Sequence, residues 1–465
     1  MERERSLRIF FALLVGVSAV GLAYGYAISS SRTTFESHLD AAGVRNPGAT
    51  VAPPRRGITV VATDSNSWRG KESGGPRARA ELVAFDADGS VRYYNDTHTR
   101  YWDLDGVNGT RATVEYAYAD HLNASACPTR YDYGKRMVSP TVWKRYAKAR
   151  STDACTRNGY ERVNRTTGEL TRIWTRITPG KEATRYHDIE RVDGTHLLVA
   201  DIYLDRVMEV NTTTGATVWT WNASDVYPRD AGGPYPEDWT HINDVKLLPD
   251  GRIMVSVRNM DQVVFLNESG GMIDSWTLGT DGNHSILYAQ HNPDYIPSKD
   301  GGPAVVVADS ENNRLVEYQR EGGRWKQTWV WRDARLQWPR DADRLPNGHT
   351  LVTDSNGNRV FELDRQGNVV WNVNIAFPYE AERLGTGPES TNGPSATAAG
   401  LRSRRGNVED KLLIFTKSFL PGKYLNGLMY VTPVWMGLPE VLALALLIVS
   451  ALVWTALTVR HVRSG

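Results

Sequence analysis

The sequence predicts an all-β protein: a six-bladed β-propeller flanked by an N-terminal and a C-terminal transmembrane helix. Three observations lead to this fold class. A short motif recurs along the middle of the chain, each copy is followed by a strand-like segment that ends in tryptophan, and one long apolar segment lies near each end of the sequence. A unit of several short strands that repeats along a chain is typical of propeller blades.

The repeat is clearest in three stretches. They read VADIYLDRVMEV at 199–210, VADSENNRLVEY at 307–318 and VTDSNGNRVFEL at 352–363. Alternating apolar residues on both sides of a polar centre indicate two strands joined by a hairpin turn. An opening strand precedes this hairpin and an outer strand follows it, so that each unit holds four antiparallel strands.

We therefore predict six blades, near residues 58–103, 113–176, 187–222, 241–278, 287–331 and 340–373. Five or seven blades would result if an edge strand from 412–416 or 429–432 closed the ring. The tryptophans, and the Asp and Arg of the motif, recur at the same place in successive units. Such periodic residues are expected to pack and brace the blades rather than to act on a substrate.

The two apolar segments run from Ile9 to Ile28 and from Val441 to Val459, and neither contains a charged residue. Each has the length that an α-helix needs to cross a bilayer. Arginines flank the segments on their outer sides, at Arg3, Arg5, Arg8, Arg460 and Arg463. The positive-inside rule then places both termini in the cytoplasm and the propeller outside the cell membrane. The first segment would also fit a cleaved signal peptide, which would export the propeller equally.

The expected organisation is an N-terminal anchor at 1–30, a linker at 31–57, a catalytic propeller at 58–379, a linker and juxtamembrane segment at 380–440, and a second helix at 441–459. Two features agree with export. Asn-x-Ser/Thr glycosylation sequences are frequent, at Asn95, Asn108, Asn123, Asn164, Asn211, Asn222, Asn267 and Asn283. The only cysteines, Cys127 and Cys155, are expected to form a disulfide in an extracellular, glycosylated protein.

The net charge of +1, from 54 basic and 53 acidic residues, argues against a nucleic-acid partner. One unit nevertheless departs from the repeat in its charge. In the fourth predicted blade, Arg258 stands where the other copies carry Ile202, Ser310 and Ser355. A cation where sibling units have small or apolar groups marks a candidate functional position.

Three histidines fall at the opening strands of consecutive blades: His187, His241 and His291. The opening strands of a propeller lie innermost, and their ends surround the central channel. We therefore expect these imidazoles and Arg258 to converge on one place, as titratable groups in an active-site cavity do. Three histidines would suit zinc, but an adjacent arginine repels a cation, so neither a metal nor a cofactor is expected. Arginine and histidine together suit a sulfate or phosphate group.

At these residues the sequence resembles the bacterial-type arylsulfotransferases. The resemblance rests on the HD pair at His187, the HIND segment at His241, the SVR segment at Arg258 and the QHN segment at His291. It covers 187–373 well, the first two blades loosely and the membrane segments not at all. It implies a nucleotide-independent sulfotransferase that moves a sulfuryl group from an aryl sulfate donor to a phenolic acceptor. His291 would become sulfated, Arg258 would hold sulfuryl oxygens, and the other histidines would line the funnel.

Two other functions fit the same fold. A membrane-anchored extracellular propeller without catalytic activity would bind a glycan or a protein partner, and a hydrolase or lyase would use the funnel with a metal. A binding module has no need for His187, His241, His291 and Arg258 together, which favours the transferase. Tethering at both ends further suggests a membrane-linked acceptor. The resemblance does not extend to an N-terminal β-sandwich, so it predicts no oligomeric state.

Overall fold

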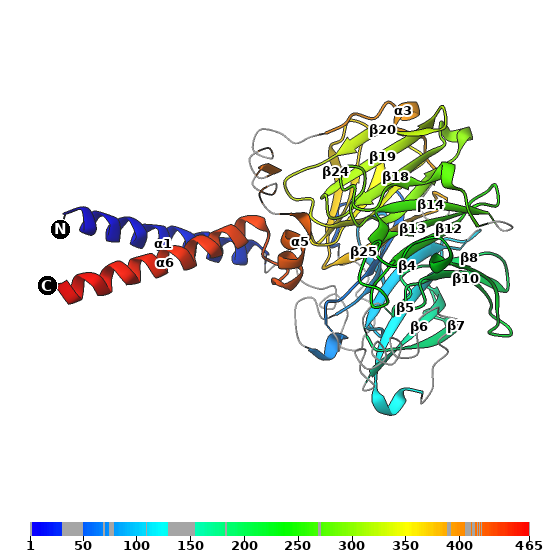
Figure 1. The fold of residues 1–465 in the computed structure, drawn as a ribbon, viewed down its shortest axis with the longest axis horizontal. Coiled ribbons are helices and arrows are strands. Elements are labelled where there is room, and N and C mark those ends of the chain that lie inside the picture. Colours follow the sequence, from blue (N-terminus) through cyan, green and yellow to red (C-terminus); the bar gives the residue numbers. More distant parts are fainter. Residues whose placement is uncertain are drawn as a thin grey trace.

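The computed structural model describes residues 2–29, 50–67, 70–73, 79–107, 109–128, 154–181, 184–267, 271–387, 392–404, 411, 414–415, 417, 419 and 421–464. Asn108, most of the expected 31–57 linker and most of the segment between the two cysteines lie outside these residues. The described part is mostly β-sheet, with two long helices at its ends (Figure 1).

Six antiparallel sheets form the six blades of the predicted propeller. The first two blades contain β25 (Pro378–Leu384), β1 (Ile58–Thr63), β2 (Leu82–Phe85) and β3 (Val91–Asn95), then β4 (Arg100–Gly106), β5 (Thr113–Asn123), β6 (Ala154–Asn164) and β7 (Leu170–Pro179). The third and fourth contain β8 (Ile189–Arg191), β9 (His196–Asp201), β10 (Arg206–Asn211) and β11 (Thr217–Asn222), then β12 (Ile242–Leu247), β13 (Ile253–Val257), β14 (Gln262–Asn267), β15 (Gly271–Met272) and the short β16 (Leu278–Gly279).

The fifth and sixth blades keep the regular four-stranded pattern. They contain β17 (His291–Ile296), β18 (Ala304–Asp309), β19 (Arg314–Glu321) and β20 (Arg324–Trp331), then β21 (Pro339–Arg344), β22 (Thr350–Asp354), β23 (Arg359–Leu363) and β24 (Val369–Asn374).

The ring closes through β25, which sequence reasoning did not single out. This strand pairs antiparallel with β1, with Ile58 opposite Leu384 and Val60 opposite Glu382, so one blade combines both ends of the propeller. Because β25 supplies the inner strand of the first blade, that blade ends one strand earlier than the predicted range 58–103. Arg100–Gly106 is instead the inner strand of the second blade. Segment 429–432, weighed as a closing strand, instead contains the end of helix α5 (Gly422–Val431).

The core consists of apolar clusters between neighbouring blades. Leu198 and Val207 of the third blade, for example, pack with Ile253 and Val255 of the fourth, and all four are buried. Burying such aliphatic side chains stabilises a fold by about 1.5–3 kcal/mol each. Adjacent blades therefore hold each other in the ring.

The periodic residues brace the blades as predicted. The indole N–H of Trp331 in the fifth blade donates to the carbonyl of Gly367 in the sixth at 2.9 Å, which joins adjacent sheets. Within the hairpins, Arg206 Nε donates to Asp201 and Arg359 Nε donates to Asp354, each at 2.8 Å. The recurrence of Trp, Asp and Arg in the sequence thus reflects architecture.

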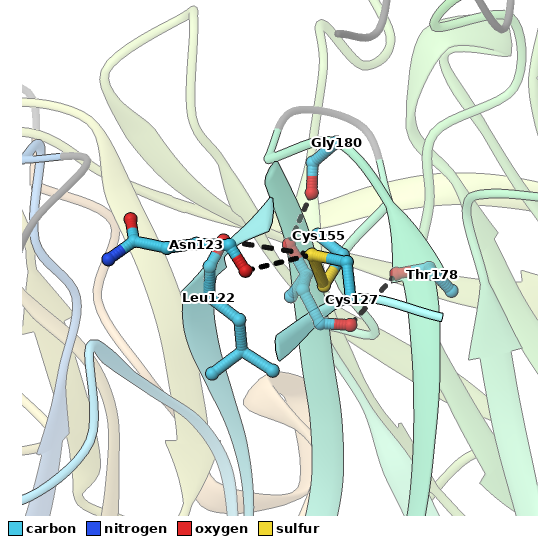
Figure 2. The surroundings of a disulfide bond; sticks show 7 residues. Leu122, Asn123, Cys127, Cys155, Thr178 and Gly180 are labelled. Carbon is cyan, nitrogen blue, oxygen red and sulfur yellow. Dashed lines mark hydrogen bonds between the residues drawn. A yellow bond between two sulfur atoms is a disulfide. The ribbon is translucent and has the colours of Figure 1, made fainter. Parts of the chain in front are cut away.

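The predicted disulfide between Cys127 and Cys155 is present, with a Cα–Cα distance of 5.8 Å. Figure 2 shows it at one end of the second blade, where Cys155 in β6 lies opposite Leu122 in β5. Cys127 follows the short 3₁₀-helix η4 (Ala124–Ala126). The bond therefore ties the sequence on both sides of the insertion to the hairpin from which it leaves.

Two long apolar helices extend from the propeller, α1 (Glu2–Ser29) and α6 (Leu438–Ser464). Segments of 24 and 26 residues within them are apolar enough to cross a membrane, which is consistent with membrane anchoring. They lie side by side, and both termini are at the end remote from the blades (Figure 1). The short helices α3 (Ala396–Ala399) and α5 pack against the propeller, and α5 lies where α6 meets the blades (Figure 1).

Candidate active site

The structure brings the four predicted site residues together. His187 lies two residues before the inner strand of the third blade, His241 directly precedes that of the fourth, and His291 is the first residue of β17. Arg258 begins the 3₁₀-turn η6 (Arg258–Met260) after β13. The rings of His187 and His241 are 5.2 Å apart, and the charge of Arg258 acts on both His241 and His291.

The backbone enters this place in an unusual conformation. His241, Trp338 and Phe377 have φ values of 48°, 55° and 51°, all in the left-handed region. A bulky residue in this region costs about 1–3 kcal/mol, and such strain is typical of sites where surrounding structure fixes the backbone. Each of the three residues directly precedes an inner strand, where it sets the direction in which the strand begins.

His187 and His291 are buried, His241 is partly buried, and all three favour the neutral form. Burial lowers the pKa of His291 well below its usual value, and the charges of Arg340 and Arg258 add to this effect. Burial likewise lowers the pKa of His187, with further contributions from His241 and Arg185. Cations near an imidazole disfavour its protonation. The site therefore combines neutral imidazoles with permanent guanidinium charges.

His291 is held by a hydroxyl group. Its Nδ1 lies 2.8 Å from Ser310 Oγ, and this serine hydroxyl also lies 2.7 Å from the carbonyl oxygen of Pro339. A hydroxyl has one proton to donate, and Ser355, at the same position of the next blade, donates its proton to the equivalent carbonyl of Pro378. Ser310 then accepts from His291 Nδ1–H, which leaves the lone pair of the imidazole on Nε2.

The other two histidines differ in their partners. His241 Nδ1 lies 2.7 Å from the carboxylate of Asp238, which raises the pKa of His241 against the larger effect of burial, although the net shift is downward. Neither ring nitrogen of His187 has a hydrogen-bond partner among the described residues. Because buried polar groups are nearly always paired, this histidine is available to a bound molecule.

Arg258 is also only partly engaged. Its Nη1 donates to the side chain of Asn259 at 2.8 Å, and its Nη2 is 4.0 Å from the carboxylate of Glu311. The Nε–H of Arg258 has no partner within the described part of the chain. A guanidinium with free donors in a buried place is suited to oxygens of an anionic group.

Sequence reasoning missed a second arginine in the site. Arg340 lies with its guanidinium 4.3 Å from the ring centre of Trp338 and 4.7 Å from that of Tyr379. It precedes Asp341 as His187 precedes Asp188, so the alignment of the opening strands already placed it at the register of a funnel residue.

Aromatic rings form the walls between the histidines. Trp102 lies 4.2 Å from His187, Tyr379 lies 5.8 Å from His187 and 6.2 Å from His291, and Trp338 lies 6.3 Å from His291, all between ring centres. These aromatics come from the inner strand of the second blade, the closing strand β25 and the entry to β21. Aromatic rings placed beside the histidines suit contact with an aryl group.

Carboxylates lie on or beside the inner strands, next to the residues of the site. Asp103 accepts the backbone N–H of Ile189 at 3.3 Å, and Asp188 accepts that of Val245 at 2.6 Å. Burial raises the pKa of Asp188 to about 7. Each carboxylate thus links the inner strands of neighbouring blades, which gives it an architectural role. Among the described residues, no group of three His, Cys, Asp or Glu side chains is arranged to hold a metal ion.

The fold and site define a six-bladed propeller in which neutral histidines, arginines and aromatic rings gather at one place. Residues 183–317 match the family model of the arylsulfotransferases (ASST), and this segment contains all four predicted site residues. The resemblance predicted from the sequence is thereby confirmed over this segment, and the match supports arylsulfotransferase activity in general. No curated protein matches the chain.

Solved structures with a similar arrangement are distant. A protein of unknown function from Bacteroides caccae has 11% identity and a TM-score of 0.43, and the match covers 70% of this chain and 97% of that protein. A periplasmic gluconolactonase from Pseudomonas aeruginosa has 13% identity and a TM-score of 0.41, with 71% and 99% covered. Virginiamycin B lyase from Staphylococcus aureus has 8% identity and a TM-score of 0.36, with 70% and 86% covered. Similarity at this level carries no information about activity.

Proposed function

We propose that this protein is a membrane-anchored, nucleotide-independent sulfotransferase that moves a sulfuryl group from an aryl sulfate donor to a phenolic acceptor through a sulfohistidine at His291. The observation that carries the proposal is the state of His291: buried, neutral, oriented by Ser310, and within the influence of Arg258 and Arg340. A neutral imidazole with its lone pair on Nε2 is a nucleophile, and nearby cations attract the anionic donor.

In the first step, the lone pair of His291 Nε2 attacks the sulfur of the aryl sulfate. The N–S bond forms while the S–O bond to the aryl group breaks. The phenolate that leaves takes a proton from a side chain of the site or from water. The imidazole retains its Nδ1 proton, donated to Ser310, so it carries a positive charge beside the negative sulfuryl group. The donor's ring lies against the aromatic walls.

The arginines act on the charge that develops at sulfur. Arg258, with His187 or His241, holds the non-bridging oxygens, and a preorganised donor of this kind lowers a barrier by about 3–4 kcal/mol. Arg340 supplies a second fixed cation. In the second step a phenol loses its proton to His187 or His241, its oxygen attacks sulfur, the N–S bond breaks, and neutral His291 is regenerated.

We further propose that α1 and α6 cross the cell membrane with both termini in the cytoplasm. Both termini lie at the same end of the paired helices (Figure 1), which gives them the same side of any membrane that the pair crosses. The arginines outside the apolar segments favour the cytoplasmic side. The propeller, with its disulfide and its glycosylation sequences, is then extracytoplasmic.

The test uses the full-length protein with 4-nitrophenyl sulfate as donor and phenol as acceptor. We expect nitrophenol release that depends on phenol, with matching formation of phenyl sulfate, and loss of both in His291→Ala. His196→Ala is the matched control because His196 lies at the start of β9, away from the funnel, and contacts Asp193. Absence of acceptor-dependent release in the wild type, or wild-type release by His291→Ala, would refute the proposal.

A further inference from the structure

Helix α5 lies between the candidate active site and the propeller-side ends of the membrane helices α1 and α6. It ends at Val431, and α6 begins at Leu438. Trp435, in the turn between the two helices, packs against Tyr26 near the end of α1, with ring centres 5.4 Å apart. The two apolar helices therefore leave the propeller beside α5, as Figure 1 also shows.

The inner face of α5 rests on the rim of the candidate active site. Asn426 Nδ2 donates to Glu311 at 2.8 Å, the same glutamate whose carboxylate faces Arg258. The approach is close, because a Cβ added to Gly422 would lie 1.7 Å from the carbonyl oxygen of Glu311. Tyr430 packs on Trp338 with ring centres 5.8 Å apart, and Trp338 in turn packs on His291. Helix α5 therefore packs directly against residues that border the candidate active site.

The outer face of α5 is apolar and exposed. Tyr424, Leu428 and Val431 are 71%, 43% and 71% exposed, and their spacing of four and three residues puts them on one side of the helix. Phe415 and Phe419, which precede α5, are 59% and 70% exposed. Exposed apolar residues that continue from two membrane-type helices are characteristic of an interfacial segment.

A cavity of about 300 Å³ lies between this membrane-side segment and the blades. Apolar residues of the turn and of α6 line one side, including Val434 and Leu438, and Gln337 and Asn356 line the other. Gln337 directly precedes Trp338 and hydrogen-bonds to Asn426 of α5. An amphipathic molecule in this cavity would have its apolar part beside the membrane helices and its polar part toward the funnel wall.

From these contacts we infer that α5 lies on the bilayer surface and that the acceptor is a membrane-resident phenol with a long apolar chain. This rests on the proposed function. The funnel mouth then opens toward the membrane, the acceptor reaches it along α5, and its chain occupies the cavity at the α5–α6 turn. Water-soluble phenols remain poorer acceptors, because nothing concentrates them at the funnel.

The test uses the full-length protein in lipid nanodiscs, 4-nitrophenyl sulfate as donor, and two acceptors with the same reacting group, phenol and 4-dodecylphenol. We expect a higher kcat/KM for 4-dodecylphenol. Tyr424→Glu combined with Val431→Glu should lower transfer to 4-dodecylphenol about tenfold, since charge weakens interfacial binding, and leave transfer to phenol within about twofold. Val218→Glu with Val370→Glu, on exposed outer strands, is the matched control. Val434→Trp, which fills the cavity, should raise KM for the long-chain acceptor alone.

A measurement independent of activity completes the test. Since Cys127 and Cys155 are paired, the Tyr424→Cys variant can be labelled singly with a fluorophore. Spin-labelled lipid should quench this label strongly and a label at position 218 weakly. No quenching at 424, or equal use of both acceptors by all variants, overturns the inference while leaving the proposed function intact. No transfer to either acceptor by the wild type overturns both.

Discussion

Replacing Ser310 with alanine tests the proposed state of His291 most selectively. The change removes the hydroxyl group that lies 2.8 Å from His291 Nδ1 and accepts its proton. A buried donor without an acceptor costs about 1–3 kcal/mol, so the imidazole instead moves its proton to Nε2 and loses the lone pair that attacks sulfur. Taking about 1.4 kcal/mol for this cost, the rate of nitrophenol release in the first turnover falls about tenfold.

Ser355→Ala is the matched control for this prediction. Ser355 occupies the same position in the next blade, is equally buried, and donates to Pro378 as Ser310 donates to Pro339. Both variants leave one buried carbonyl without its donor, so both should lower the free energy of unfolding by about 1–3 kcal/mol. Only Ser310→Ala should slow the burst of nitrophenol measured by stopped flow.

Two outcomes would refute this reasoning. Equal burst rates in Ser310→Ala and the wild type would mean that Ser310 does not orient His291. Equal slowing by Ser310→Ala and Ser355→Ala would mean that the effect is one of general stability. Ser310→Thr, which keeps the hydroxyl group, should recover most of the burst rate if the hydrogen bond is the cause.

Three further predictions address the cations, the pH dependence and the disulfide. Arg258→Lys keeps the charge but removes the planar fork, and kcat/KM for 4-nitrophenyl sulfate should fall by roughly 10- to 100-fold; an unchanged value would exclude Arg258 as the sulfuryl clamp. Because burial lowers the pKa of His291 below the ordinary value of about 6.5, the burst rate should stay flat from pH 8 to about 6.5. A burst rate that falls as the pH is lowered within this range would contradict a neutral, buried nucleophile. Below about pH 6.5 the unfolded chain binds a proton at this histidine, whereas folded His291 stays neutral. The contribution of His291 to the free energy of unfolding should therefore fall as the pH drops below about 6.5. Reducing the bond between Cys127 and Cys155, which are 28 positions apart, should lower the urea midpoint by the equivalent of about 3–4 kcal/mol and leave the burst rate unchanged; a lost burst would place the second-blade insertion at the site.

Much of the fold was predictable because the repeat encodes contacts within single blades and between neighbours. The pairs Asp201–Arg206 and Asp354–Arg359 join adjacent strands of one hairpin, so their periodic spacing in the sequence is the geometry itself. Ring closure was not predictable in this way. Strand β25 lies far in sequence from β1, and PYEAERL lacks the turn and Trp signals of the other units.

The candidate site was likewise predictable only in part. His187, His241, His291 and Arg258 were visible in the sequence as features of particular blades. They come together because the histidines stand at the starts of inner strands and Arg258 follows the adjacent strand β13. Ser310 was seen only as the residue that Arg258 replaces, since its contact with His291 depends on the twist between neighbouring strands. Tyr379 was missed because its strand was missed. These partners follow from three-dimensional packing rather than from spacing.

The central claim is covalent transfer through His291, and trapping the intermediate tests it most directly. The full-length protein is mixed with 4-nitrophenyl sulfate without acceptor, quenched at alkaline pH, digested and mapped by mass spectrometry. We expect the added mass of one SO₃ group on His291, formed at the rate of the nitrophenol burst and removed by phenol. A burst without modification of His291, or with the sulfuryl group on another residue, would contradict it.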